Sequence, residues 1–279
     1  MRAAETAFLC RQAAAELFQV ESPEQVVFTS NATHGLNLAI HSLLKPGDAV
    51  VISGYEHNAV TRPLHAIPNV TVRVAESTLF DRKGAVEAFR SAITPEVSAV
   101  VCCHVSNVFG FILPVEEIAG LCRERNVPLI VDASQSAGCV PLDMEALGTA
   151  YMAMPGHKGL YGPQGTGLLL CGDTAPQPLL EGGTGSASLV QTMPDFLPDR
   201  LEAGTHNVTG IAGLLEGLRF VRRTGVENIG RRESALICRL SANLEQIPGI
   251  TLFRAQDPRA QAGVLSLQVR EWTARSWES

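Results

Sequence analysis

Short apolar runs alternate along the chain with segments in which apolar residues recur at helical spacing. The successive pairs are VVFTS then THGLNLAIHSLL, AVVISG then HNAVTRPLHA, VSAVVCCHV then PVEEIAGLCRERN, and PLIVDAS before SAGCVPLDMEALG. Continuous apolar runs of this length are typical of strands buried on both faces, and connecting helices allow such strands to run parallel. The pattern therefore predicts an α/β fold in which a mostly parallel sheet is flanked by helices.

The remaining segments extend this fold at both ends. AYMAMP and GTGLLLCG predict two more strands, and the spacing of apolar residues predicts a helix over 3–18 and one helix running into another over 207–246. GITLFRA and GVLSLQV resemble the opening strands of a second unit, whereas REWTARSWES fits neither a strand nor a helix. We therefore expect a large domain over 1–245 and the incomplete start of an α+β small domain over 246–279.

Charge and composition exclude several kinds of partner. Lysine and arginine total 22 against 28 acidic residues, a net charge of −6 without any run of like charges. This balance gives no reason to expect nucleic acid or an anionic membrane as a partner. No apolar run is long enough to cross a bilayer, and the acidic residues Glu5 and Glu16 argue against an export signal in the first helix.

The seven cysteines have no spaced framework, which favours free thiols in a reducing cytoplasm. Cys102, Cys103 and His104 are adjacent, but neighbouring strand residues point to opposite faces and no second ligand pair follows at metal-site spacing. We expect no metal site.

Chemistry in such a sheet is expected just after each apolar run, because ligands of open α/β sheets bind beyond the carboxyl ends of the strands. Ala32 and Thr33 begin a helix after the first run, where free backbone N–H groups could hold an anion such as phosphate. Taken alone, Asn31 or Thr33 is more simply a helix cap. His57 follows the second run and could lie flat on a planar ring, although an isolated histidine is more often a polar loop residue.

The later strand ends add an amide, an acid and an amine. Asn107 follows the third run, and Asp132 ends the fourth with Gln135 close behind. A buried aspartate is costly unless its charge is paired, but helix capping is about as common a role. Lys158 lies in the glycine-rich turn PGHKGLYGPQGTG and could form a Schiff base if its pKa is lowered; otherwise it is an exposed turn residue.

Together these groups are the parts that a pyridoxal phosphate site requires: an anion cradle, a stacking ring, an acid for the pyridine nitrogen and an amine for the aldehyde. The 26 residues from Asp132 to Lys158 leave room for one helix and one strand, so both side chains can reach one pocket. Neither a P-loop nor a dinucleotide-binding glycine motif competes for the phosphate.

At these residues the chain resembles the class V aminotransferases, a family of fold-type I pyridoxal phosphate enzymes, and within it the cysteine desulfurases and selenocysteine lyases. The motifs that carry the resemblance, in family order from about Val26 to Thr209, are FTSNATHGLN, EHNAV, SNVFG, VDASQSAG, PGHKGLYGPQGTG and EAGTHN. The resemblance implies a mostly parallel seven-stranded sheet with an α+β small domain.

Carried over residue by residue, the resemblance makes Lys158 the Schiff-base lysine, Asp132 the partner of the pyridine nitrogen and His57 the stacking ring. The remaining cofactor contacts that it implies are Ala32, Thr33 and His157 at the phosphate, Gln135 at the phenolic oxygen, and Asn107 near the ring and substrate. It further implies a homodimer, in which Gly204 and Thr205 reach the phosphate of the other subunit.

The chain departs from the family pattern at three places. Pro155 stands where many desulfurases have a serine that binds phosphate. The chain starts at the helix that follows the usual opening segment, and it stops before the position of the cysteine that receives sulfur and of the arginine that binds the substrate carboxylate. These departures predict a chain truncated at both ends, with cofactor binding retained and turnover impaired.

The resemblance implies a cysteine desulfurase-like enzyme that converts cysteine to alanine and passes sulfur to a cysteine, with a sulfur-acceptor protein as a possible partner. Two alternatives stay open: a class V aminotransferase or selenocysteine lyase that uses the same residues, and a non-catalytic truncated remnant. Sulfur, selenium and amino-group chemistry share these residues, so the sequence leaves the substrate open.

Overall fold

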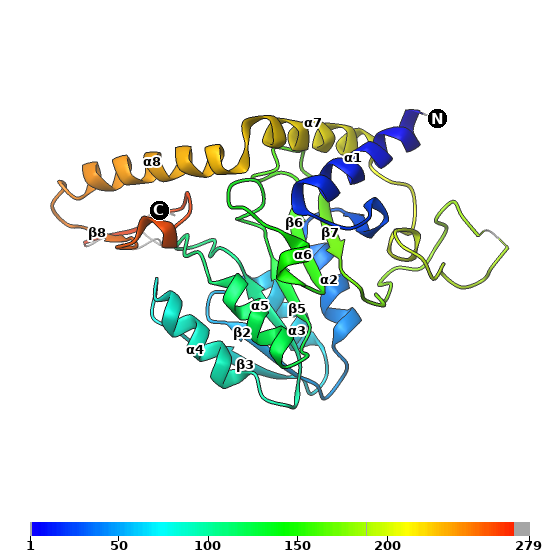
Figure 1. Ribbon diagram of the computed structural model, residues 1–279, viewed down its shortest axis with the longest axis horizontal. Coiled ribbons are helices and arrows are strands. Elements are labelled where there is room, and N and C mark those ends of the chain that lie inside the picture. Colours follow the sequence, from blue (N-terminus) through cyan, green and yellow to red (C-terminus); the bar gives the residue numbers. More distant parts are fainter. Residues whose placement is uncertain (1, 188, 271–279) are drawn as a thin grey trace, which may run out of the picture.

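Nine strands and eight helices make up the computed structural model, which describes residues 2–187 and 189–270 (Figure 1). The strands are β1 Val26–Thr29, β2 Ala49–Ser53, β3 Thr71–Ala75, β4 Val97–Cys103, β5 Leu129–Asp132, β6 Tyr151–Pro155, β7 Gly167–Cys171, β8 Ile250–Phe253 and β9 Ser266–Val269. The helices are α1 Arg2–Phe18, α2 Ala32–Leu43, α3 Asn58–Ala66, α4 Arg82–Ala92, α5 Val115–Glu124, α6 Met144–Leu147, α7 Val208–Thr224 and α8 Val226–Leu244.

Seven of the strands form one sheet in the order β1-β7-β6-β5-β4-β2-β3. The pairs β2–β3, β2–β4, β4–β5 and β5–β6 are parallel, whereas β7 runs antiparallel to both of its neighbours. The predicted mostly parallel, seven-stranded sheet is confirmed. A helix and a strand, α6 and β6, separate Asp132 from Lys158 as the spacing predicted.

Both faces of the sheet are covered, which explains the continuous apolar runs. On one face Val100, Cys102 and Val131 pack with residues of α1, α5 and α7; on the other Val101 and Ile130 pack with residues of α2 and α3. Successive strand side chains alternate between the two clusters, so every position of a central strand must be apolar. The polar positions of these strands are left at their ends.

Three details differ from the pattern-based expectation. The pattern missed β3 because this edge strand is exposed at three of its five positions and buried only at Ala75, and it missed the following helix α4. The helical stretch expected over 136–148 contains only the four-residue α6, preceded by turns.

The C-terminal part begins where α7 ends. Gly225, with φ of 85°, separates α7 from α8, so the predicted pair of consecutive helices is confirmed. α8 leads to a two-stranded antiparallel sheet of β8 and β9 (Figure 1). The proposed boundary between 1–245 and 246–279 stays a prediction, and REWTARSWES lies outside the described residues except for Arg270.

A buried ion pair joins the first helix to the segment before α7. Glu202 accepts hydrogen bonds from Arg11 Nη1 and Nη2 at 2.8 and 2.6 Å, from the N–H of Phe28 at 2.6 Å and from His206 Nε2 at 2.8 Å. The guanidinium also lies 4.1 Å from the centre of the Phe28 ring. Burial alone would raise the pKa of Glu202, but the bonds from His206 and Arg11 hold it below its ordinary value.

Loss of this carboxylate should destabilise the fold strongly, because it leaves the buried Arg11 guanidinium without its counter-charge. We expect Glu202→Ala to lower the free energy of unfolding by about 3–5 kcal/mol, measured by urea titration. Glu216→Ala removes an exposed pair with Arg219 and should cost less than about 1 kcal/mol. Equal losses in the two variants would contradict the structural role of Glu202.

Candidate active site

A cavity of about 190 Å³ opens at the carboxyl ends of β1, β2, β4, β5 and β6. It brings together eight of the ten predicted site residues: Ala32, Thr33, His57, Asn107, Asp132, Gln135, His157 and Lys158. Because these positions span 127 residues of sequence, from 32 to 158, only the convergence of the strand ends places them side by side.

Gly204 and Thr205 do not line this cavity. Gly204 instead donates its N–H to the carbonyl of Gly183 at 2.8 Å, in a turn where its φ is 94°. Their role at a phosphate therefore stays a prediction that depends on a second subunit.

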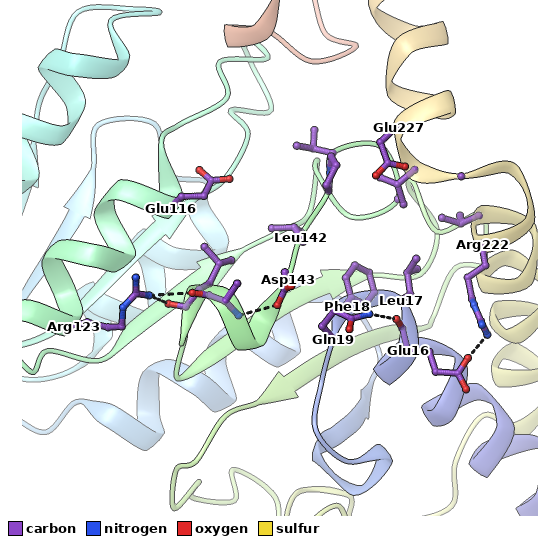
Figure 2. A pocket seen from close by; sticks show the side chains of 18 residues that line it. Glu16, Leu17, Phe18, Gln19, Glu116, Arg123, Leu142, Asp143, Arg222 and Glu227 are labelled. Atoms are coloured by element: carbon purple, nitrogen blue, oxygen red, sulfur yellow. Dashed lines mark hydrogen bonds and ion pairs between the residues drawn. The ribbon is translucent and has the colours of Figure 1, made fainter.

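A larger cavity of about 700 Å³ lies elsewhere, between the end of α1, α6 and the junction of α7 and α8 (Figure 2). It contains none of the predicted site residues. Several of its charged groups are paired with groups of its own wall: Arg222 with Glu16, Arg123 with the carbonyl of Leu147, and Asp143 with the N–H of Ala146 (Figure 2). This cavity offers no comparable set of catalytic groups.

The start of α2 lines the smaller cavity and has the features of an anion site. Asn31 caps this helix by accepting the N–H of His34 at 2.9 Å, which leaves the first-turn N–H groups of Ala32 and Thr33 without an intrahelical acceptor. The helix N-terminus adds a partial positive charge there. Asn31 is thus the cap that the sequence suggested. Its bond to His34 still leaves the N–H groups of Ala32 and Thr33 available for an anion.

His57 is fixed at the start of α3. Its Nδ1 accepts the N–H of Ala59 at 3.0 Å, so the ring proton lies on Nε2 when the imidazole is neutral. This bond anchors one edge of the ring while the residue lines the cavity.

Asp132 and Lys158 provide the acid and the amine. Asp132 is 4% exposed and accepts the N–H of Ser134 at 2.9 Å. Burial raises the pKa of the Asp132 carboxyl, against the bond from Ser134 and the charges of Lys158 and His57. Partial burial lowers the pKa of the Lys158 amine, against the attraction of Asp132, which favours the neutral amine that a carbonyl group needs.

Backbone contact explains why the lysine turn is rich in glycine. The turn after β5 meets the turn after β6 at Gly138 and Gly159, where an added Cβ would lie 2.0 Å from the Gly159 oxygen or 2.3 Å from the Ala137 oxygen, respectively. Gly138 also has φ of 91°. The two turns that carry Gln135 and Lys158 can therefore approach this closely only without side chains.

Asn31 and Pro155, which the sequence already singled out, also line the cavity, together with five residues to which the sequence gave no role: Tyr55, Ala59, Cys103, Val105 and Ser134. Ser134 could have been found from sequence, because an aspartate at a strand end commonly accepts the N–H two residues later. Cys103 could not, since its burial depends on the neighbouring strand.

Glu56 lies directly before His57 and ties β2 to β4. Its Oε1 accepts the Ser53 hydroxyl at 2.6 Å and the Cys103 N–H at 2.7 Å, whereas its buried Oε2 has no hydrogen-bond partner among the described residues. Burial raises the pKa of Glu56 to about 8, and the charge of Asp132 adds to the increase. The two neighbouring carboxyls thus differ in what opposes the effect of burial on the pKa. For Asp132 the charges of Lys158 and His57 act against it, whereas Glu56 has only neutral hydrogen-bond donors.

A family model described as "Aminotransferase class-V" matches residues 1–278. The chain belongs to the class-V aminotransferase family. A probable cysteine desulfurase of Xylella fastidiosa strain 9a5c is 34% identical over 255 residues, which cover 87% of this chain and 61% of the relative. The chain spans less than two thirds of the length of several curated relatives, for example 38% of one from Mycolicibacterium paratuberculosis.

Several solved structures share the fold. The apo structure of cysteine desulfurase from Thermococcus onnurineus NA1 matches with a TM-score of 0.91 and 28% identity, over 99% of this chain and 71% of that one. The cystine C–S lyase C-DES, in complex with its reaction product cysteine persulfide, matches with a TM-score of 0.82 and 28% identity, over 96% of this chain and 74% of that one. Another C-DES structure has glycine covalently linked to its PLP cofactor.

The cavity of this class-V chain fits pyridoxal phosphate, the cofactor that the family and these neighbours imply. The start of α2 suits a phosphate, the Asp132 carboxyl suits a protonated ring nitrogen, and the Lys158 amine suits an aldehyde. Pro155 supplies no side-chain donor. The candidate phosphate contacts are therefore the backbone N–H groups of Ala32 and Thr33 and the side chain of His157.

The raised pKa of Glu56 predicts a pH-dependent stability difference between the wild type and Glu56→Gln. Folding keeps Glu56 protonated up to about pH 8, whereas the unfolded side chain ionises near pH 4.5. The stabilisation is complete below pH 4.5 and is lost as the pH rises to 8. Glutamine does not ionise, so from pH 5 to pH 9 the stability of the variant relative to wild type should rise by about 1–4 kcal/mol.

Urea titrations at four pH values would measure this difference, with Glu87→Gln on the exposed face of α4 as the control. A difference between wild type and Glu56→Gln that does not vary with pH would show that Glu56 is ionised in the folded protein.

Proposed function

We propose that this chain binds pyridoxal phosphate on Lys158 and catalyses a cysteine desulfurase-type reaction, in which cysteine loses sulfur and alanine is formed. The observation that carries the proposal is the convergence of the α2 start, His57, Asp132 and Lys158 on one cavity. The similarity to desulfurases supports cysteine as the substrate.

When bound, pyridoxal phosphate supplies an electron sink for a carbanion at the α carbon of an amino acid. The side chains have separate tasks around it. Asp132 would hold a proton at the ring nitrogen, and His57 would hold the ring by stacking against it. Lys158 would hold the aldehyde and then, once free, move a proton at the substrate α carbon, which its lowered pKa favours.

Gln135 and Asn107 complete the proposed polar contacts. Gln135 lies in the turn after Asp132 and is proposed to contact the phenolic oxygen, while Asn107 is proposed to lie near the ring and substrate. Ala32, Thr33 and His157 are proposed to contact the phosphate, and Gly204 and Thr205 the phosphate of a second subunit.

Exposed apolar residues support the proposal of a homodimer. Between β7 and α7 the chain extends away from the sheet (Figure 1) and exposes Leu180, Leu189 and Val190 by 63%, 97% and 58%, respectively. Groups of exposed apolar side chains commonly mark interaction surfaces. The seven free cysteines support the cytoplasm as the proposed location, and no described helix is long and apolar enough to cross a membrane.

The sulfur acceptor is proposed to be a thiol other than the cysteine in the cavity. Cys103 is the cysteine that lines the cavity among the described residues. Burial raises the pKa of its thiol well above the ordinary value, and Glu56 adds to the effect, so no thiolate forms there near neutral pH. An acceptor protein or a small thiol would meet the requirement.

This inert thiol also favours a second candidate, carbon–sulfur lyase chemistry. A lyase breaks the Cβ–S bond of a cystine-like substrate by β-elimination, without a nucleophilic cysteine, and releases a persulfide; water then converts the remaining three-carbon fragment to pyruvate and ammonia. The similarity to C-DES supports this candidate.

The chain has only three lysines, which makes the cofactor attachment directly testable. After incubation with pyridoxal phosphate and reduction with borohydride, mass spectrometry should find the label on Lys158. A variant with Lys45→Arg and Lys83→Arg should still show the visible cofactor band, and Lys158→Ala should lose it. Label distributed over Lys45 and Lys83 would instead favour the non-catalytic alternative.

The products would separate the two candidate reactions. With cysteine and an added thiol such as dithiothreitol, we expect equal amounts of alanine and sulfide from a desulfurase. Pyruvate and ammonia from cystine, without alanine from cysteine, would favour the lyase. Lys158→Ala should lower either rate by at least about 10²-fold, the typical contribution of acid–base catalysis.

A further inference from the structure

The segment between β4 and α5 forms a small hairpin that carries Asn107 at its tip. Val105 and Ile112 pair antiparallel, Ser106 and Phe111 are joined by a 3.0 Å bond between N–H and carbonyl, and Gly110 donates its N–H to the Ser106 carbonyl at 2.9 Å. Within the turn, the Ser106 hydroxyl accepts the N–H groups of Val108 and Phe109 at 3.3 and 3.2 Å. The position of Asn107 depends on these local bonds and on what packs against the turn.

The C-terminal unit packs against it. Residues 260–262 lie antiparallel to the outer arm of the hairpin, and Ile112 donates its N–H to the Ala260 carbonyl at 2.9 Å. Ala262 donates in turn to the Gly110 carbonyl at 2.8 Å. The segment before β9, about 150 residues away in sequence, thus pairs with the hairpin through an isolated bridge between Phe111 and Gln261.

Gln261, in the middle of this paired segment, is buried, and both the nitrogen and the oxygen of its side-chain amide are hydrogen-bonded. Its Nε2 donates to the carbonyls of Phe109 at 3.1 Å and Val264 at 2.9 Å, with that of Phe253 at 3.3 Å, and its Oε1 accepts the Ala255 N–H at 2.9 Å. One side chain therefore holds β8, the segment before β9 and the hairpin turn together.

Two further contacts fix the same turn. Gly110 has φ of 69°, and an added Cβ would lie 2.7 Å from the Val264 oxygen, so this backbone contact requires glycine. The rings of Phe109 and Phe253 meet edge to face with centres 5.6 Å apart. The hairpin turn is therefore held by residues 253–264 of the C-terminal unit, which contact it at Phe109 and Gly110.

We propose that Gln261 is a positioning residue for the cofactor cavity: it holds the turn 106–110 and thereby keeps Asn107 at the cavity wall. This inference rests on the proposed function, because it gives Asn107 a role at the cofactor. Gln261 itself is not among the residues that line the cavity, so its effect on the chemistry would pass through the turn that carries Asn107.

Gln261→Met tests the proposal, because methionine is close in volume and lacks the amide. The matched control is Arg254→Ala, which removes the 3.1 Å ion pair of Arg254 with Glu245 within the same C-terminal part. In Gln261→Met we expect amide hydrogen exchange over residues 106–112 to accelerate at least about tenfold, with less than a twofold change in Arg254→Ala. Unchanged exchange in Gln261→Met would overturn the proposal.

A double-mutant cycle with Asn107→Ala shows whether the effect reaches the cavity through Asn107. The dissociation constant for pyridoxal phosphate should rise about tenfold in Gln261→Met, and less than twofold when the same change is made in Asn107→Ala. Effects that multiply in the double variant would show that Gln261 acts independently of Asn107 and would overturn the inference.

The circular dichroism band of the bound cofactor provides a third readout, since a loss of fold stability alone does not alter it. Failure of the wild type to bind the cofactor would reject the proposed function, whereas the exchange experiment tests the clamp without any cofactor. Normal wild-type binding with unchanged exchange, affinity and dichroism in Gln261→Met would reject only the clamp.

Discussion

The central strands of the large sheet are buried on both faces, so polar side chains can enter this part of the molecule only where a strand ends. The parallel direction of β2, β4, β5 and β6 then brings several such ends to one edge. Asp132 is the last residue of β5, and Lys158 follows β6 by three residues. The cavity is in this sense a consequence of how the core is packed.

The electrostatic arrangement around the cavity depends on differences between similar groups. Asp132 and Glu56 are both buried carboxyls, but Asp132 has Lys158 and His57 close by, whereas Glu56 accepts bonds only from a hydroxyl and a backbone N–H. A second ionised carboxyl there would compete with Asp132 for the same cations. Lys158 and His57 thus favour the ionised form of Asp132, whereas no cation favours that of Glu56.

The parts of the fold that the sequence predicts are those with local signals. Buried strands, long amphipathic helices and the order of the site residues follow from periodicity and strand ends, which is why Asp132 and Lys158 could be paired in advance. The edge strand β3 has a weaker pattern because most of it faces solvent. The roles of Glu56 and Gln261 could not be recognised from their neighbours in the sequence. Each depends on a hydrogen bond to a distant residue, Cys103 at 47 and Phe109 at 152 residues away, respectively.

The contact between Gly138 and Gly159 has a consequence for how this sequence can vary. The distance between the two turns is set by peptide atoms alone, and every other amino acid would add a carbon where another backbone atom lies. Neighbouring side chains cannot make room by changing rotamer, because the obstructing atoms belong to the main chain. Both positions are therefore closed to substitution as long as the two turns keep this distance, so the spacing between Gln135 and Lys158 depends on two residues that carry no functional group.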